Sequence, residues 1–145
     1  MSYKGKFTPK NYQKYMGDPT NIIYRSLLER RFMVYCDTNA SILNWSSEEV
    51  VIPYYSPIDK KWHRYFVDFC IKYKNSNDEV KTVLIEVKSA SQTKPPKKIT
   101  DRKPTRRYLN EVMTWGVNQA KWNAANEYCK DRKWEFKIFT EKELT

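Results

Sequence analysis

Three charged residues stand out because they interrupt apolar segments at a spacing that suits chemistry. Asp68 lies inside the apolar run Tyr65–Ile71. Glu86 and Lys88 close the apolar run that begins at Val83. A carboxylate among apolar side chains costs free energy unless it is paired or binds a cation. Residues two apart on a strand share one face of the sheet, so Glu86 and Lys88 are expected to point the same way.

A turn signal between the two runs predicts how these residues meet. Residues 75–78 read Asn-Ser-Asn-Asp, which predicts an antiparallel hairpin. If the turn centres on Asn77, Asp68 lies opposite Glu86, with Cβ atoms roughly 4.5–5.5 Å apart. A register slip of one residue would place Asp68 on the other face of the sheet.

Two carboxylates at that separation repel each other unless a cation lies between them. Mg²⁺ or Mn²⁺ suits the pair because these ions take oxygen ligands, and the backbone carbonyl of Val87 can supply another oxygen. Such an ion lowers the pKa of a water molecule and polarises a phosphodiester. Lys88 would orient or activate the water, or stabilise charge on the transition state. The competing interpretation is structural, with an Asp68–Lys88 ion pair at the sheet end and Glu86 in solvent.

The pattern of the rest of the chain predicts the elements that position these residues. A basic arm over about 1–20 precedes a helix over about 21–37. Three strands follow at about 45–55, 62–73 and 80–88, then a basic loop at about 89–107. A helix at about 107–131 and a strand at 134–139 complete the order αβββαβ. This order predicts one mixed α/β (α+β) domain over residues 1–145.

Composition narrows the class of protein. The chain has 145 residues, a net charge of +10 and a pI near 9.5, which favours a polyanionic partner such as nucleic acid. It has no apolar run long enough to span a membrane and no secretory signal at its start, so a cytosolic location is expected. Cys36, Cys70 and Cys129 lack the paired spacing of zinc ligands and are expected to be buried thiols.

Several further residues are candidates for the site or for DNA contacts. Glu29 is expected near the metal, against the alternative that it pairs with Arg25 on the helix surface. Glu48 is a candidate for the metal shell or for binding a basic partner. His63 and Arg64 are expected to contact phosphate, together with seven residues of the basic loop: Lys94, Lys97, Lys98, Arg102, Lys103, Arg106 and Arg107.

Segments spread over most of the chain resemble the head-completion nucleases of tailed phages, a group within the PD-(D/E)XK nucleases. The segments that carry the resemblance are Gly5–Asn11, Lys14–Gly17, Tyr24–Arg30, Asn44–Glu48, Ile52–Tyr55, His63–Phe69 and Leu84–Lys88. One departure is Val67, which stands where the name-giving motif has proline.

The resemblance implies a restriction-endonuclease-like αβββαβ core, with a mixed central sheet flanked by helices. It also implies metal-dependent cleavage of DNA, with Asp68 and Glu86 as metal ligands, Lys88 as the catalytic lysine and Glu29 completing the site. The implied setting is phage head completion in the host cytoplasm, with portal, neck or other head-completion proteins as partners and retention in the virion as an alternative. Endonuclease and exonuclease cutting both remain open, as does the oligomeric state.

Two other functions compete with this one. A structural head or neck component would grip DNA ends without cutting, but it has no chemical need for an intact Asp68, Glu86 and Lys88. A basic DNA-binding domain of another kind would not need acids within apolar strands.

Overall fold

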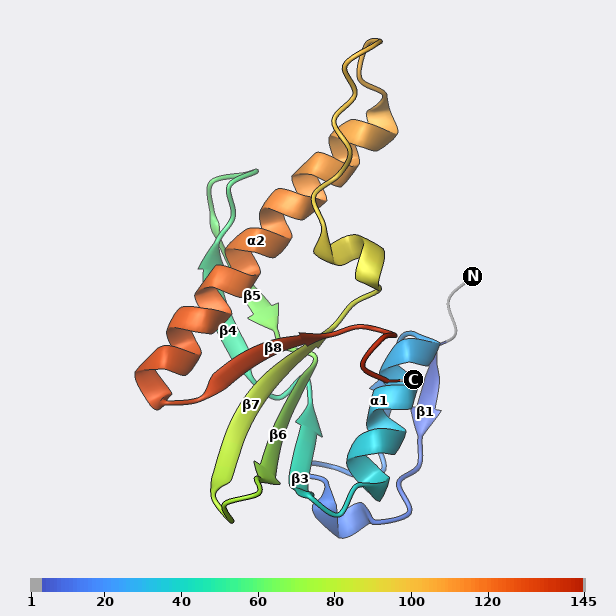
Figure 1. The fold of residues 1–145 in the computed structure, drawn as a ribbon, viewed down its shortest axis with the longest axis vertical. Helices are drawn as coiled ribbons and strands as arrows, with labels where there is room; N and C mark the ends of the chain where they lie inside the picture. Colours follow the sequence, from blue (N-terminus) through green and yellow to red (C-terminus); the bar gives the residue numbers. More distant parts are fainter. Residues whose placement is uncertain (1–3, 145) are drawn as a thin grey trace.

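A computed structural model describes residues 4–144 (Figure 1). The elements run in the order β1 (Gly5–Phe7), η1 (Tyr12–Lys14), β2 (Ile22–Tyr24), α1 (Leu27–Thr38), β3 (Ile42–Ser47), β4 (Val51–Tyr55), β5 (Trp62–Phe66), β6 (Phe69–Lys74), β7 (Val80–Val87), η2 (Ala90–Thr93), α2 (Arg106–Arg132) and β8 (Glu135–Phe139). The mixed α/β class is thereby confirmed.

The central sheet has four strands in the order β3-β6-β7-β8. β6 and β7 form the expected antiparallel hairpin, with Phe69 opposite Ile85 and Lys74 opposite Val80. This is the register predicted from a turn centred on Asn77. β8 returns beside β7 in the parallel direction, which makes the sheet mixed.

Each face of the sheet is covered by one helix and has its own core (Figure 1). On the α1 side, Phe32 and Met33 pack with Ile85 and Val87. On the α2 side, Leu84 packs with α2 residues such as Trp122, Ala125 and Cys129. Because side chains alternate along β7, Glu86 lies on the α2 side, the face opposite Ile85 and Val87. Neither helix is long and apolar enough to cross a membrane within residues 4–144.

The first two predicted strands are each broken near one end of the sheet, which corrects the expected boundaries. The first divides at Glu48, whose φ of 56° lies in the left-handed region. The second divides at residues 67–68, so that β4 and β5 form a separate two-stranded ribbon. Two backbone hydrogen bonds bridge the bend, from Glu48 N–H to Asp68 C=O at 3.1 Å and from Val67 N–H to Val50 C=O at 3.0 Å. The ribbon thereby turns away from the sheet and packs on α2.

The first helix is shorter than predicted, because residues 22–24 form a strand that pairs with β1. The helix begins where Ser26 accepts the Glu29 N–H at 3.1 Å through its side chain, as an N-cap. The basic arm packs on the fold, with Phe7 and Tyr15 in the α1-side core. Residues 1–3 of the arm lie outside the described residues.

The second helix and the basic loop agree more closely with the sequence. α2 has Thr105 as its N-cap and ends at Lys133, whose φ of 61° is left-handed. The loop contains the short helix η2 and then rises beside the N-terminal half of α2, away from the sheet (Figure 1). Cys36 and Cys129 are buried as predicted, while Cys70 is half-buried.

Candidate active site

The bend between β5 and β6 places Asp68 at the end of the sheet. In the ladder, the residue opposite Val87 would be Val67, but the strand has left the sheet at this point. The side chain of Asp68 replaces it, and its Oδ2 accepts the Val87 N–H at 2.8 Å. The sequence predicts Asp68 inside a continuous strand, and this is corrected: the break in the strand is what turns its carboxylate onto β7.

Glu86 lies beside Asp68, and each of its two carboxylate oxygens has a partner. It is 6% exposed, and its Oε2 accepts a short hydrogen bond from the hydroxyl of the buried Tyr65. Its Oε1 lies 3.6 Å from the ammonium nitrogen of Lys88. The structural alternative placed Glu86 in solvent with Lys88 bound to Asp68. The structure instead buries Glu86 and joins Lys88 to it.

The pKa of Asp68 reflects the burial of two neighbouring carboxylates. Loss of solvent raises the pKa of Asp68 well above its ordinary value, and the charges of Glu86 and then Glu29 raise it further. The Val87 N–H and the Lys88 ammonium oppose this increase. The fold therefore holds a carboxyl group whose ionised form is poorly compensated by its protein neighbours, which is the environment that a cation relieves.

Glu29 approaches the same end of the sheet from the start of α1. Its Oε1 accepts the backbone N–H of Arg25 at 3.3 Å, and burial raises its pKa. The guanidinium of Arg25 pairs with Glu48 instead of Glu29. The alternative of an Arg25–Glu29 side-chain pair is therefore wrong. Glu29 is close enough to Glu86 and Asp68 for their charges to act on one another.

The oxygen atoms at this end of the sheet suit a hard divalent cation, and they come from both side chains and the backbone. Within residues 4–144, no three His, Cys, Asp or Glu side chains converge so as to hold a metal ion by themselves. The two carboxylates of Asp68 and Glu86 would supply anionic oxygens, with the Val87 carbonyl beside them and water in the remaining positions. Mg²⁺ usually binds in this way, through one or two carboxylates and several waters.

Tyr65 is the residue of the site that sequence reasoning missed. It is 3% exposed, and burial together with the Glu86 charge raises its pKa, so it remains a neutral donor. A tyrosine in an apolar strand looks like an ordinary core residue. The hairpin register does not predict its contact with Glu86, because the chain bends at residues 67–68, between Tyr65 and the paired part of the hairpin.

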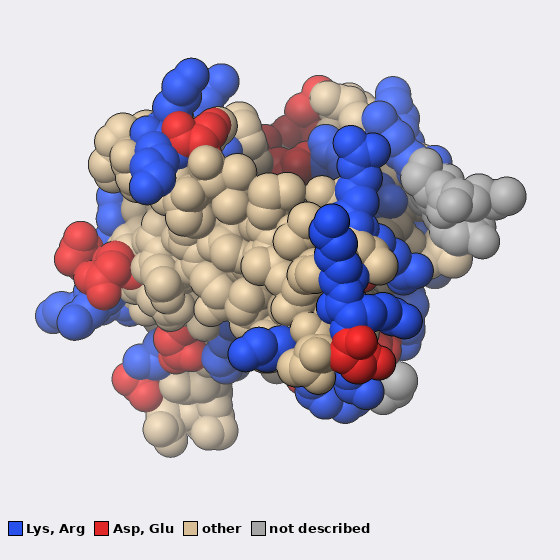
Figure 2. All heavy atoms as spheres, turned by 90° about the horizontal axis from the view of Figure 1, so that it is seen from above, with Lys and Arg blue, Asp and Glu red and all other residues tan. Residues whose placement is uncertain are grey.

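The residues predicted to bind DNA do not all lie together. His63 pairs with Asp59 at 2.6 Å and stacks on Tyr54, toward the tip of the β4–β5 ribbon. Arg64 lies over the Phe66 ring at 5.6 Å on the exposed face of the same ribbon. All seven of the basic residues predicted for the loop are exposed. The predicted loop was too long, because Arg106 and Arg107 lie in the first turn of α2, which begins after its N-cap Thr105. Figure 2 shows Lys and Arg side chains around a broad neutral face, on the side toward which the loop rises.

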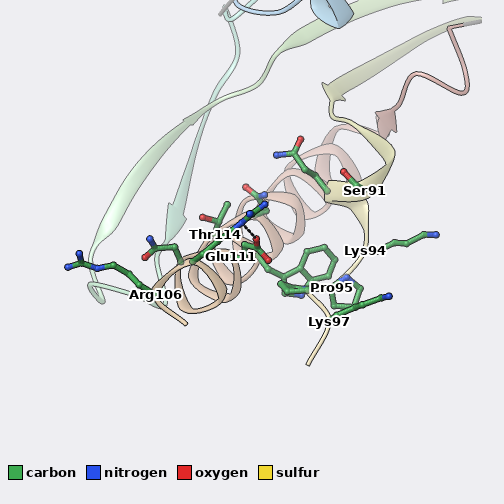
Figure 3. Close-up of a pocket in the computed structure, with 13 residues that line it drawn as sticks. Ser91, Lys94, Pro95, Lys97, Arg106, Glu111 and Thr114 are labelled. Atoms are coloured by element: carbon green, nitrogen blue, oxygen red, sulfur yellow. Dashed lines mark hydrogen bonds and ion pairs between the residues drawn. The ribbon is translucent and has the colours of Figure 1, made fainter. Parts of the chain in front are cut away.

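A groove of about 1050 Å³ separates the basic loop from α2. Pro95, Pro96 and Trp115 contribute apolar surface to it, and Arg107 pairs with Glu111 on the helix side at 3.2 Å. Figure 3 shows Lys94 and Lys97 extending from the loop away from the helix, and Arg106 extending to the opposite side. All three residues line the groove, but the charged ends of their side chains extend outward. Trp122 is buried in the core on the α2 side of the sheet.

Two comparisons with known proteins agree with this geometry. The family described as TnsA-like endonuclease N terminal matches residues 39–141. This chain belongs to the TnsA-like endonuclease family. The Head completion nuclease of Enterobacteria phage T4 is 40% identical to the chain over 143 residues, which are 97% of this chain and 93% of that protein. The nuclease interpretation and the restriction-endonuclease-like fold are confirmed.

The family match covers the residues at the end of the sheet. Asp68, Glu86 and Lys88 all lie within residues 39–141, as does the bend at Glu48. Glu29 and the basic arm precede the matched region. This TnsA-like endonuclease therefore carries its carboxylate pair and lysine within the shared domain, and Glu29 joins them from the segment before it.

Proposed function

We propose that this nuclease hydrolyses DNA at a divalent-metal centre, with Mg²⁺ or Mn²⁺ held by Asp68, Glu86 and the carbonyl of Val87. The observation that carries the proposal is the buried Asp68–Glu86 pair, which the bend in β5–β6 creates and which the Val87 N–H and the Tyr65 hydroxyl hold in place. When bound, the ion polarises the scissile phosphate and lowers the pKa of a water molecule.

The protein groups orient the centre and balance its charge. The Val87 N–H fixes Oδ2 of Asp68, and Tyr65 fixes Oε2 of Glu86, which leaves Oε1 of Glu86 on the side of Lys88. Lys88 is about a quarter exposed, so its ammonium reaches both Glu86 and a phosphate that enters from solvent. It stabilises negative charge on the phosphate or orients the attacking water. Glu29, in the first turn of α1, adds a third acidic group close enough to act on the Asp68–Glu86 pair.

The two roles of Lys88 predict different behaviour of an arginine substitution. Lys88→Arg keeps the positive charge but cannot transfer a proton, because arginine stays protonated. Cutting that survives in Lys88→Arg and is lost in Lys88→Met assigns an electrostatic role. Equal loss in both variants assigns proton transfer or a strict geometric requirement.

The basic loop is proposed to track the DNA backbone next to this centre. Its cations are exposed, and Lys94, Lys97 and Arg106 point outward, as sequence-independent phosphate contacts require. His63 and Arg64 are proposed to contact DNA along the β4–β5 ribbon. The similarity to a head completion nuclease supports action on DNA during phage head completion, in the host cytoplasm or in the assembling virion, beside portal or neck proteins.

Incubation of the purified protein with circular and linear DNA tests the proposal. Mg²⁺ or Mn²⁺ should support cutting and a chelator should abolish it, while Asp68→Asn and Glu86→Gln should cut at least about 100-fold more slowly, since each loses a charged ligand. Conversion of circular DNA establishes internal cutting. Unchanged cutting in chelator, or by both variants, would overturn the metal centre.

A further inference from the structure

The outer face of the β4–β5 ribbon carries a row of exposed aromatic side chains. Directly opposite residues share a face, and the pairs on the outer face are Val51–Phe66, Pro53–Arg64 and Tyr55–Trp62. Trp62 is 70% exposed, Tyr55 49% and Phe66 46%. The inner face, by contrast, buries Ile52, Tyr54 and Tyr65 against α2. One face of the ribbon therefore builds the core, and the other displays aromatic rings to solvent.

This aromatic row is not explained by folding. Exposed aromatic side chains cost solubility, and contiguous apolar surface of this kind marks a binding site. Tyr55 and Trp62 pack edge to face with centroids 5.6 Å apart, so the two rings support each other on the surface. The Arg64 guanidinium lies over the Phe66 ring, which adds a cation to the middle of the row.

The row starts beside the candidate active site. Phe66 is two residues before Asp68, and its partner Val51 follows the bend at Glu48 that shapes the site. From Phe66 to Trp62 the strand rises about 13 Å, at about 3.3 Å per residue. That length equals about four steps of a nucleic-acid strand at about 3.4 Å each.

Charge favours a nucleic acid over an apolar protein surface. The six paired residues of this face, all within the described part of the chain, include Arg64 and no acid, and Lys60 and Lys61 lie at the tip of the ribbon. Asp59, the acid beside them, is paired with His63. Aromatic rings combined with cations along a path are what single strands bind, since every base has a face that can stack. A duplex has no unstacked base faces to offer the rings.

We infer that the outer face of the β4–β5 ribbon binds an unpaired DNA strand that leaves the active site, with bases stacked on Phe66, Tyr55 and Trp62 and a phosphate on Arg64. The inference rests on the proposed DNA-cutting function and narrows its substrate to DNA with an unpaired segment next to the cut.

Binding in chelator tests the inference without requiring cutting. Fluorescence anisotropy of an oligothymidylate about ten nucleotides long, within the usual site size, gives the dissociation constant of each variant. Trp62→Thr and Tyr55→Thr keep strand propensity and remove a ring. Each should raise the dissociation constant at least about five-fold, the loss expected for one stacked base. Tyr12→Thr removes an equally exposed ring from η1 and should leave it within about two-fold.

Four results separate the possible outcomes. Weaker oligothymidylate binding by Trp62→Thr, with blunt-duplex binding unchanged and the same thermal unfolding midpoint as wild type, supports the inference. Unchanged oligothymidylate binding by both variants overturns it. A change confined to self-association in sedimentation velocity also overturns it and assigns the face to a second copy of the chain. If the protein cuts no DNA at all but the variants still lose single-strand binding, the proposed function fails while this binding face remains.

Discussion

Asp68→Asn removes one of the two like charges at the end of the sheet while nearly preserving the size of the side chain. The asparagine oxygen can still accept the Val87 N–H, so the bend is expected to persist. The structure raises the pKa of Asp68 through burial, Glu86 and Glu29. In the folded state the carboxyl therefore keeps its proton at pH values where the unfolded chain, with a pKa of about 3.9, has lost it.

The sign and size of the effect on stability follow from this difference. Between the unfolded and the folded pKa of Asp68, the folded state binds more protons, so the free energy of unfolding falls as pH rises. One proton gives a slope of at most about 1.4 kcal/mol per pH unit. This contribution is fully present below pH about 4 and is lost as pH rises through the folded pKa. Asp68→Asn lacks it and should show a flatter profile in metal-free buffer.

Urea unfolding in chelator, followed from about pH 4 to pH 8, measures this slope. Asp101→Asn, an exposed substitution in the basic loop, serves as the matched control and should follow wild type. Mn²⁺ at about 100 times its dissociation constant should then stabilise wild type by about 2.7 kcal/mol at neutral pH and Asp68→Asn far less. Parallel profiles for wild type and Asp68→Asn would refute the reasoning.

Three further variants, two single and one fourfold, test other parts of the account. Tyr65→Phe removes the hydroxyl that holds Glu86 in place. It should weaken Mn²⁺ binding about 10-fold or more in titration calorimetry while the protein stays folded. Equal affinity would mean that Tyr65 contributes only to core packing. The Asp37 carboxylate accepts the backbone N–H groups of Lys10 and Asn11, each at 2.9 Å, and Asp37→Ala leaves both without an acceptor. The free energy of unfolding in urea should fall by about 2 kcal/mol or more, with little change in the rate of cutting. A fall of less than about 0.5 kcal/mol would contradict the role of Asp37 in attaching the arm. A third variant neutralises Lys97 and Lys98 of the basic loop together with Arg106 and Arg107 of the first turn of α2. It should weaken duplex binding and lower the salt slope by about 0.9 for each phosphate that is no longer neutralised. An unchanged slope would remove these four cations from the interface.

The hairpin and its register were predictable because local chemistry determines them. The turn at residues 75–78 and the apolar alternation on both sides leave one register that buries Ile71, Val83 and Ile85 together. That register also predicted that Asp68 approaches Glu86, although the bend, and not the ladder, turns the Asp68 carboxylate onto β7. The order of the two long helices and the four strands of the central sheet followed from the same patterning, and so did the boundaries of α2 to within a residue.

The bend that completes the site was not predictable from the pattern. Residues 45–55 and 62–73 each look like one long strand, because β-branched and aromatic residues are frequent throughout both ranges. The departure is driven by packing on α2, far away in sequence. The role of Tyr65 depends on that bend and was missed with it. The first helix was extended over residues 21–26 because the pairing of β2 with β1 is also a long-range contact.

Diffraction from crystals soaked in Mn²⁺ would locate the ion most directly through its anomalous signal. The account predicts one strong peak between Asp68 and Glu86, about 2.0–2.2 Å from a carboxylate oxygen of each and near the Val87 carbonyl. The peak should disappear in Asp68→Asn crystals. A peak elsewhere in the molecule, or two carboxylates that turn away from each other with no ion between them, would contradict the account.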